Sequence, residues 1–122
     1  MLVYFVMSTW NPYNTVLMRA KLRLDPWQGF QLAPPGSAAP TGSISAVSRK
    51  PEAMELWWTA SNGSVQAAFW YEGSTWQRYE LAPPGSAAPT GSISAVSRKP
   101  ETMELWWIGE DASIDDKFWY ET

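Results

Sequence analysis

The 122-residue chain has neither cysteine nor histidine, and these two absences remove several classes of function. Without cysteine the chain cannot form disulfides, thiolate metal sites or a cysteine nucleophile. Without histidine as well, neither a zinc site of the usual kind nor a serine–histidine–aspartate relay can be built. We therefore expect no metal and no cofactor, and we do not expect an enzyme.

Positive charge is also scarce, with 9 basic against 12 acidic side chains and a net charge of −3. Because a phosphate-binding surface needs clustered Lys and Arg, this balance argues against a nucleic-acid partner. No stretch approaches the roughly 18 apolar residues of a membrane span. The apolar start, residues 2–7, is too short for the core of a signal peptide. The localisation is therefore unknown, and a longer, secreted parent protein stays open.

What the chain does have is a near-perfect internal repeat. Residues 32–58 and 81–107 are identical except that Ala53 in the first copy becomes Thr102 in the second. The segments that follow, 59–72 and 108–121, have diverged further but stay in register. A fixed period of this length is typical of repeat architectures, which build one domain from stacked copies of a single unit.

The complete period contains four short strand candidates, and no helical periodicity is found anywhere in the chain. Pro, Gly and Asn separate the candidates at positions where they break a strand ladder. The candidates in the complete period are residues 43–49, 54–60, 64–72 and 76–82. Four short strands in a period of about 40 to 50 residues are the pattern of a β-propeller blade. The predicted fold class is therefore all-β, built from four-stranded antiparallel propeller blades.

The repeat divides the chain into about two and a half blades of one continuous domain. We expect residues 1–33 to be a divergent partial blade whose fourth strand is 27–33. Residues 34–82 are expected to be a complete blade, and 83–122 a partial blade that lacks its last strand. An incomplete ring exposes sheet faces and edges that invite pairing. We therefore expect a homo-oligomer or the remainder of a longer propeller chain.

Nine tryptophans are present, and many large rings in one chain serve either as core or as a surface on which a ligand stacks. Adjacent aromatic residues, as in Trp57–Trp58, place rings on both faces of a strand. This suits an inner strand that neighbouring blades cover on both sides. The small residues of 43–49 suit the crowded strand nearest the axis, and the core interpretation is favoured for most of the rings.

Two equivalent sets of side chains are candidate ligand-binding sites. The first set is Arg49, Glu55 and Trp57, and the second is Arg98, Glu104 and Trp106. In each set the arginine and glutamate lie on either side of a four-residue turn, so we expect them to be close. They would form either a polar clamp for sugar hydroxyls beside a tryptophan platform, or a strand-end ion pair worth about 0–1 kcal/mol.

Trp76 is a further candidate, because it opens the outermost strand of the complete blade. An exposed ring at this position could stack on the apolar face of a sugar. The alternative is a wedge between neighbouring blades, which is the favoured interpretation.

The repeat resembles the blades of the fucose-specific lectins of fungi and bacteria. The residues that carry the resemblance are Trp57–Trp58, the hairpin Asn62-Gly63-Ser64-Val65, Tyr71-Glu72-Gly73 and Trp76. The resemblance covers residues 27–122, and it implies a propeller that binds sugar between adjacent blades. An arginine of the family's sugar site is replaced here by Glu55 and Glu104, so fucose specificity does not follow.

These observations lead to two hypotheses of function. The first is a non-catalytic, lectin-like module with glycans as partners, because several weak identical sites gain avidity when they are displayed together. The alternative is a structural or protein-interaction propeller fragment with no small-molecule ligand, in which every tryptophan belongs to the core.

Overall fold

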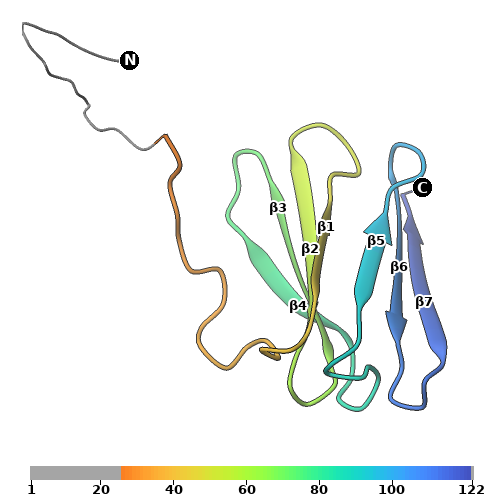
Figure 1. The fold of residues 1–122 in the computed structure, drawn as a ribbon. Coiled ribbons are helices and arrows are strands. Elements are labelled where there is room, and N and C mark those ends of the chain that lie inside the picture. Colours follow the sequence, from red (N-terminus) through yellow and green to blue (C-terminus); the bar gives the residue numbers. More distant parts are fainter. Residues whose placement is uncertain (1–25, 122) are drawn as a thin grey trace, which may run out of the picture. The chain divides into compact units, whose positions relative to one another are not determined.

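A computed structural model describes residues 26–121, and within this range the chain is all-β (Figure 1). The strands form one four-stranded and one three-stranded antiparallel sheet, here called the first and second sheets. The first sheet consists of β1 (Ile44–Val47), β2 (Ala53–Thr59), β3 (Val65–Tyr71) and β4 (Gln77–Ala82). The second consists of β5 (Ile93–Val96), β6 (Thr102–Ile108) and β7 (Ile114–Tyr120). The predicted all-β class is confirmed, and the two sheets are consistent with partial propeller blades.

The strand order in each sheet follows the sequence, β1-β2-β3-β4 and β5-β6-β7. The two sheets also have the same register, since Ile44 lies opposite Trp58 and, one repeat later, Ile93 lies opposite Trp107. The four strands predicted for the complete period are confirmed to within a few residues. Within the described residues the second sheet has β7 at its edge.

The chain divides into two compact units, residues 1–31 and 32–122. Residues 26–33 form no strand, so the expected fourth strand at 27–33 is absent from the structure. A strand needs a ladder beside it, and no strand of the two described sheets pairs with this segment. The strands expected at 2–8 and 15–25 lie outside the described residues. No described helix is long and apolar enough to span a membrane.

The hydrophobic core lies between the two sheets. It joins Trp57 and Val65 of the first sheet to Met103, Leu105 and Trp107 of the second. The facing strands β1 and β5 lie in contact, as Figure 1 shows. Small residues allow this approach, because Ser45 Oγ accepts a hydrogen bond from the backbone N–H of Ala95 at 3.1 Å. The first strands of the two repeats thus approach each other closely, and their place nearest a propeller axis stays a prediction.

The proline-rich loops before β1 and β5 are folded rather than extended. Each contains two tight turns closed by backbone hydrogen bonds, such as Ser86 N–H to Pro83 O at 3.2 Å. Each also accepts a hydrogen bond from a tryptophan indole: Trp58 donates to Ser37 O at 3.0 Å, and Trp107 to Ser86 O at 3.1 Å. The loops are folded caps on the second tryptophan of each pair.

Candidate binding cleft between the sheets

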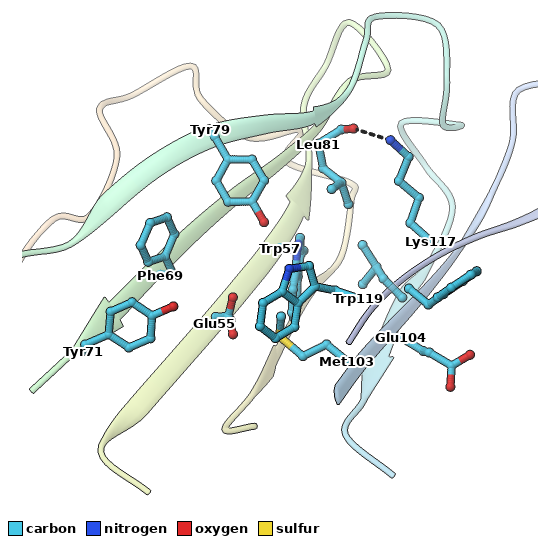
Figure 2. Close-up of a pocket in the computed structure, with 12 residues that line it drawn as sticks. Glu55, Trp57, Phe69, Tyr71, Tyr79, Leu81, Met103, Glu104, Lys117 and Trp119 are labelled. Atoms are coloured by element: carbon cyan, nitrogen blue, oxygen red, sulfur yellow. Dashed lines mark hydrogen bonds between the residues drawn. The ribbon is translucent and has the colours of Figure 1, made fainter. Parts of the chain in front are cut away.

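The facing surfaces of the two sheets enclose a cleft of about 280 Å³ (Figure 2). From the first sheet it is lined by Glu55, Trp57, Phe69, Tyr71, Tyr79 and Leu81. From the second sheet it is lined by Met103, Glu104, Leu105, Lys117, Phe118 and Trp119. The lining is mostly aromatic and aliphatic, with a few polar groups among the rings, which is the usual make-up of a small-molecule site.

Strand alternation places the first-sheet residues on one face. Successive side chains of a strand point to opposite faces, so Glu55 and Trp57 share a face of β2 while Leu56 and Trp58 share the other. Glu55 lies opposite Phe69 on the neighbouring strand, and Phe69 lies opposite Gln77 of β4. The face of β2 that carries Glu55 is therefore bordered by the rings of β3 and β4.

Glu55 is the buried charge of the cleft. Burial raises the pKa of its carboxyl above the ordinary glutamate value, although the positive charge and hydrogen bond of Arg49 act in the opposite direction. The Nε of Arg49 lies 3.0 Å from Glu55 Oε1. Arg49 contacts Oε1 of this carboxylate, and among the described residues the other oxygen accepts no hydrogen bond, so it is an acceptor beside the cleft.

Tyr79 and Lys117 add polar atoms at the border of the cleft. Burial raises the pKa of the Tyr79 hydroxyl, and the charge of Glu55 raises it further, whereas a hydrogen bond with Trp57 lowers it. The hydroxyl therefore stays protonated and can donate at neutral pH. Lys117 donates from Nζ to Leu81 O at 3.1 Å and so ties β7 to β4 across the cleft. Within residues 26–121 no acidic cluster is arranged to hold a metal ion.

Arg49 lies at one end of the cleft and ties the two sheets together. Its guanidinium donates to three carboxylates and a hydroxyl: Glu55 at 3.0 Å, Glu101 at 2.8 Å, Glu121 at 2.6 Å and Tyr71 at 2.7 Å. It also lies 4.6 Å from the ring centre of Trp119. Burial disfavours its charge, but the hydroxyl of Tyr71 and the carboxylate of Glu55 outweigh burial, so the pKa is raised. Four of its five N–H donors are therefore used by the protein.

Arg98, the equivalent of Arg49 in the second repeat, keeps only the contacts within its own sheet. Its Nε lies 3.4 Å from Glu104 Oε1, and its Nη2 donates to Tyr120 at 3.2 Å. The predicted proximity of arginine and glutamate is thus present in both repeats. Whether either pair binds a ligand stays a prediction.

The remaining candidates do not lie together. Glu55 and Trp57 line the cleft together, beside Arg49. Trp106 lies on the other face of the second sheet, in a shallow depression with Ile108 and Ile114. Glu104 is at the border of the cleft, and in Figure 2 its carboxylate points away from Glu55. Trp76 is half-buried just before β4 and lines neither space.

Several lining residues were not among the sequence candidates, above all Tyr71, Tyr79 and Trp119. Their common signal is the alternation of β3, β4 and β7, which puts every second residue on one face. That signal identifies Tyr71 and Tyr79 as neighbours of Glu55. It does not identify Trp119, because this ring comes from the next repeat and reaches the cleft only through the packing of the two sheets.

No family model matches the chain, and no curated protein matches it. A structure search finds the fold of AofleA from Arthrobotrys oligospora, a fungal lectin, with a TM-score of 0.61. The two chains are 17% identical, and the match covers 70% of this chain and 25% of the lectin chain. The fold is lectin-like.

The match spans only a quarter of the lectin's own length. At this level of identity the similarity concerns the fold alone. The function therefore has to be argued from the cleft itself.

Proposed function

We propose that this chain is a non-catalytic, lectin-like carbohydrate-binding module whose site is the cleft between the two sheets. The observation that carries the proposal is the combination of a buried carboxylate, Glu55, with aromatic rings from both sheets around a space of about 280 Å³. This volume lies near the lower end of the roughly 300–1,000 Å³ of small-molecule pockets, which suits a single sugar ring. The lectin-like fold supports the same class of ligand.

Each part of a sugar has a counterpart in the cleft. Its C–H face would pack against an indole, since aromatic rings offer a flat apolar surface with a polar edge. Its hydroxyls would donate to the Glu55 carboxylate and accept from the Tyr79 hydroxyl, and hydrogen bonds to a charged acceptor are the stronger kind. Arg49 would act from behind by fixing the position of Glu55 rather than by touching the ligand.

One observation favours the alternative, a structural or protein-interaction module without a small ligand. Arg49 donates its hydrogen bonds to carboxylates of both sheets, and Trp119 packs on its guanidinium. These contacts hold the sheets together and need no ligand. In that case the rings around the cleft would serve the packing of the sheets alone.

The deciding experiment is binding of the folded full-length chain to a broad glycan array that includes fucosides, followed by calorimetry with the best sugar. Glu55→Gln should weaken that binding about tenfold or more, since a charge-assisted hydrogen bond is worth about 1.5–3 kcal/mol. Glu80→Gln is the matched control, because Glu80 lies on the opposite face and accepts only from Gln66, at 3.2 Å.

A blank array from material with an intact β-sheet circular dichroism spectrum would reject the carbohydrate proposal and leave the structural one. Equal loss of binding in the Glu55 and Glu80 variants would place the sugar outside the cleft.

A further inference from the structure

Aromatic rings line the cleft from several directions. The ring centres of Phe69 and Tyr71 lie 5.6 Å apart with 52° between the planes, and those of Phe69 and Tyr79 lie 6.0 Å apart with 59° between them. These three side chains are here called the ring wall. Trp57 and, from the second sheet, Trp119 complete the aromatic lining (Figure 2). Because the rings are tilted against one another, they can surround a ligand group instead of only stacking on one of its faces.

A buried carboxylate lies beside the ring wall. Glu55 is opposite Phe69 in the register of β2 and β3, and 8% of its side chain is exposed. Its Oε1 accepts from Arg49, whereas the second oxygen accepts no hydrogen bond from the described residues. A buried polar atom without a partner costs free energy, so such atoms are normally satisfied. The second oxygen therefore favours a donor or a cation in the cleft.

The cations of the chain do not balance the negative charge at this end of the cleft. Arg49 binds three carboxylates, those of Glu55, Glu101 and Glu121. Lys50 is a second cation there, since its charge acts on Glu55 and Glu121. Three negative charges against two positive ones leave one negative charge in excess. Burial raises the pKa of Glu55 in spite of both cations, so its charge is only partly compensated.

The rings of the cleft already hold cations of the chain itself. The guanidinium carbon of Arg49 lies 4.6 Å from the ring centre of Trp119 and 5.4 Å from that of Tyr71. Lys50 Nζ lies 5.6 Å from the ring centre of Tyr71. A separation of up to about 6 Å is the range of a cation–π contact. Among the described residues no cation lies over Phe69 or Tyr79, so these two rings are available to a cation that enters.

Two further charged side chains line the cleft at its border. Glu104 is paired with Arg98 at 3.4 Å, and its carboxylate points away from Glu55 in Figure 2. Lys117 donates to Leu81 O at 3.1 Å. Among the described lining residues Lys117 alone is positively charged. It is therefore the lining group that opposes a bound cation.

We propose that the cleft binds an organic ammonium group, held by the ring wall and by the second oxygen of Glu55. Cation–π attraction is strongest where water is excluded, and aromatic cages use it to recognise ammonium ligands. The carboxylate supplies the opposite charge. The inference uses the cleft of the proposed function, but it does not require the ligand to be a sugar. Two kinds of compound carry this group: a methylated amine such as choline, and an amino sugar with a protonated amine.

The test compares charged ligands with neutral partners of similar shape, by calorimetry on the full-length chain at pH 7. The first pair is choline and 3,3-dimethylbutan-1-ol, in which carbon replaces the charged nitrogen. The second pair is glucosamine and glucose. An ordinary apolar cleft prefers the neutral compound, because a cation costs more to desolvate. The charged member should bind at least tenfold more tightly in one pair, and that pair identifies the source of the ammonium group.

Three variants separate the groups that hold the charge. Glu55→Gln should lower the affinity for the preferred charged ligand at least tenfold and leave its neutral partner unchanged. Lys117→Gln should raise the same affinity roughly twofold, since it removes the opposing charge at the border. Glu80→Gln is the matched control and should change neither affinity. Circular dichroism on each variant shows whether the fold is kept.

Equal affinity for the charged and neutral members of both pairs would overturn the inference. A Glu55→Gln chain that keeps the preference for charge, or a Lys117→Gln chain that loses it, would do the same. The choline pair contains no sugar. A preference for choline with a blank glycan array would therefore keep the ammonium site and reject the carbohydrate proposal. Glycan binding with no preference for charge in either pair would do the reverse.

Discussion

Arg49 and Arg98 occupy the same position in two copies of one sequence, yet 4% of the Arg49 side chain is exposed and 52% of Arg98. The difference comes from the carboxylates of the following repeat, Glu101 and Glu121. They cover the guanidinium of Arg49 and do not contact Arg98. A surface ion pair contributes little, whereas breaking a buried one leaves an unpaired charge behind. The two equivalent arginines therefore contribute unequally to the stability of the fold.

Arg49→Met should lower the free energy of unfolding by about 3 kcal/mol, because Glu55 is left buried without its partner. Arg98→Met should leave the urea midpoint unchanged within error. The measurement is urea unfolding followed by tryptophan fluorescence, with all variants at the same protein concentration. Equal effects of the two changes would contradict the assignment of Arg49 as the tie between the sheets.

The protonation of Glu55 should control glycan binding. Burial raises the pKa of this carboxyl, so as the pH falls it takes up its proton before an ordinary glutamate does. Affinity should therefore decline at a pH above that at which exposed carboxyls titrate. Calorimetry from pH 7 to pH 4 would show the decline, and Glu55→Gln should flatten the profile at its low-affinity end.

Stability should respond to Glu55 in the opposite sense. A raised pKa in the folded state means that the contribution of this group is fully present below the unfolded pKa. The contribution is lost as the pH rises through the folded value. Glu55 itself thus does not cause acid unfolding, and loss of binding in mild acid with an unchanged fold is the expected signature. A binding profile that follows the unfolding profile would argue against this role of Glu55.

At the scale of the elements, the two equivalent hairpin turns differ in what surrounds them. Gly63 in the β2–β3 turn has φ of 80°, and a Cβ there would lie 2.8 Å from Ala87 O of the capping loop. Ala112 holds the same place in the β6–β7 turn with φ of 67°. Glycine is thus required where a loop docks on the turn, and the second turn carries a residue with a Cβ at a cost in backbone strain.

Gly63→Ala should destabilise the chain by more than about 2 kcal/mol, since strain and a clash with backbone add together. Gly73→Ala is the matched control, because Gly73 has φ of 87° but nothing within 4 Å of an added Cβ. It should cost only about 1 kcal/mol. Thermal unfolding of both variants gives the comparison, and equal costs would show that the loop does not press on the turn.

Ala112→Gly should act in the opposite direction and stabilise the chain by up to about 1 kcal/mol, because it relieves strain at a positive φ. The same thermal unfolding measurement tests it. A lower melting temperature would mean that the added conformational entropy of glycine in the unfolded chain outweighs the relief of backbone strain in the folded chain.

The sequence could predict the elements better than the site. Turn residues such as Asn62–Gly63 and the alternation of β2 mark each strand locally, so the strands of both sheets followed from the repeat. The folded shape of the capping loops did not follow from the repeat, because it depends on hydrogen bonds that indoles of β2 and β6 donate to the loops. Trp119 in the cleft was missed for a similar reason: its place depends on how one sheet stacks on the next, which no local pattern records.

At the scale of the whole molecule, the number of sugar sites should follow from the way the two sheets pack. The two described sheets form one cleft between them, and Trp106 lies on the other face of the second sheet, in a shallow depression. Calorimetry with the best sugar should therefore give one site per chain, and Glu55→Gln should weaken that site whereas Trp106→Ala should not. Two sites per chain, or loss of binding in the Trp106 variant, would place a site outside the cleft.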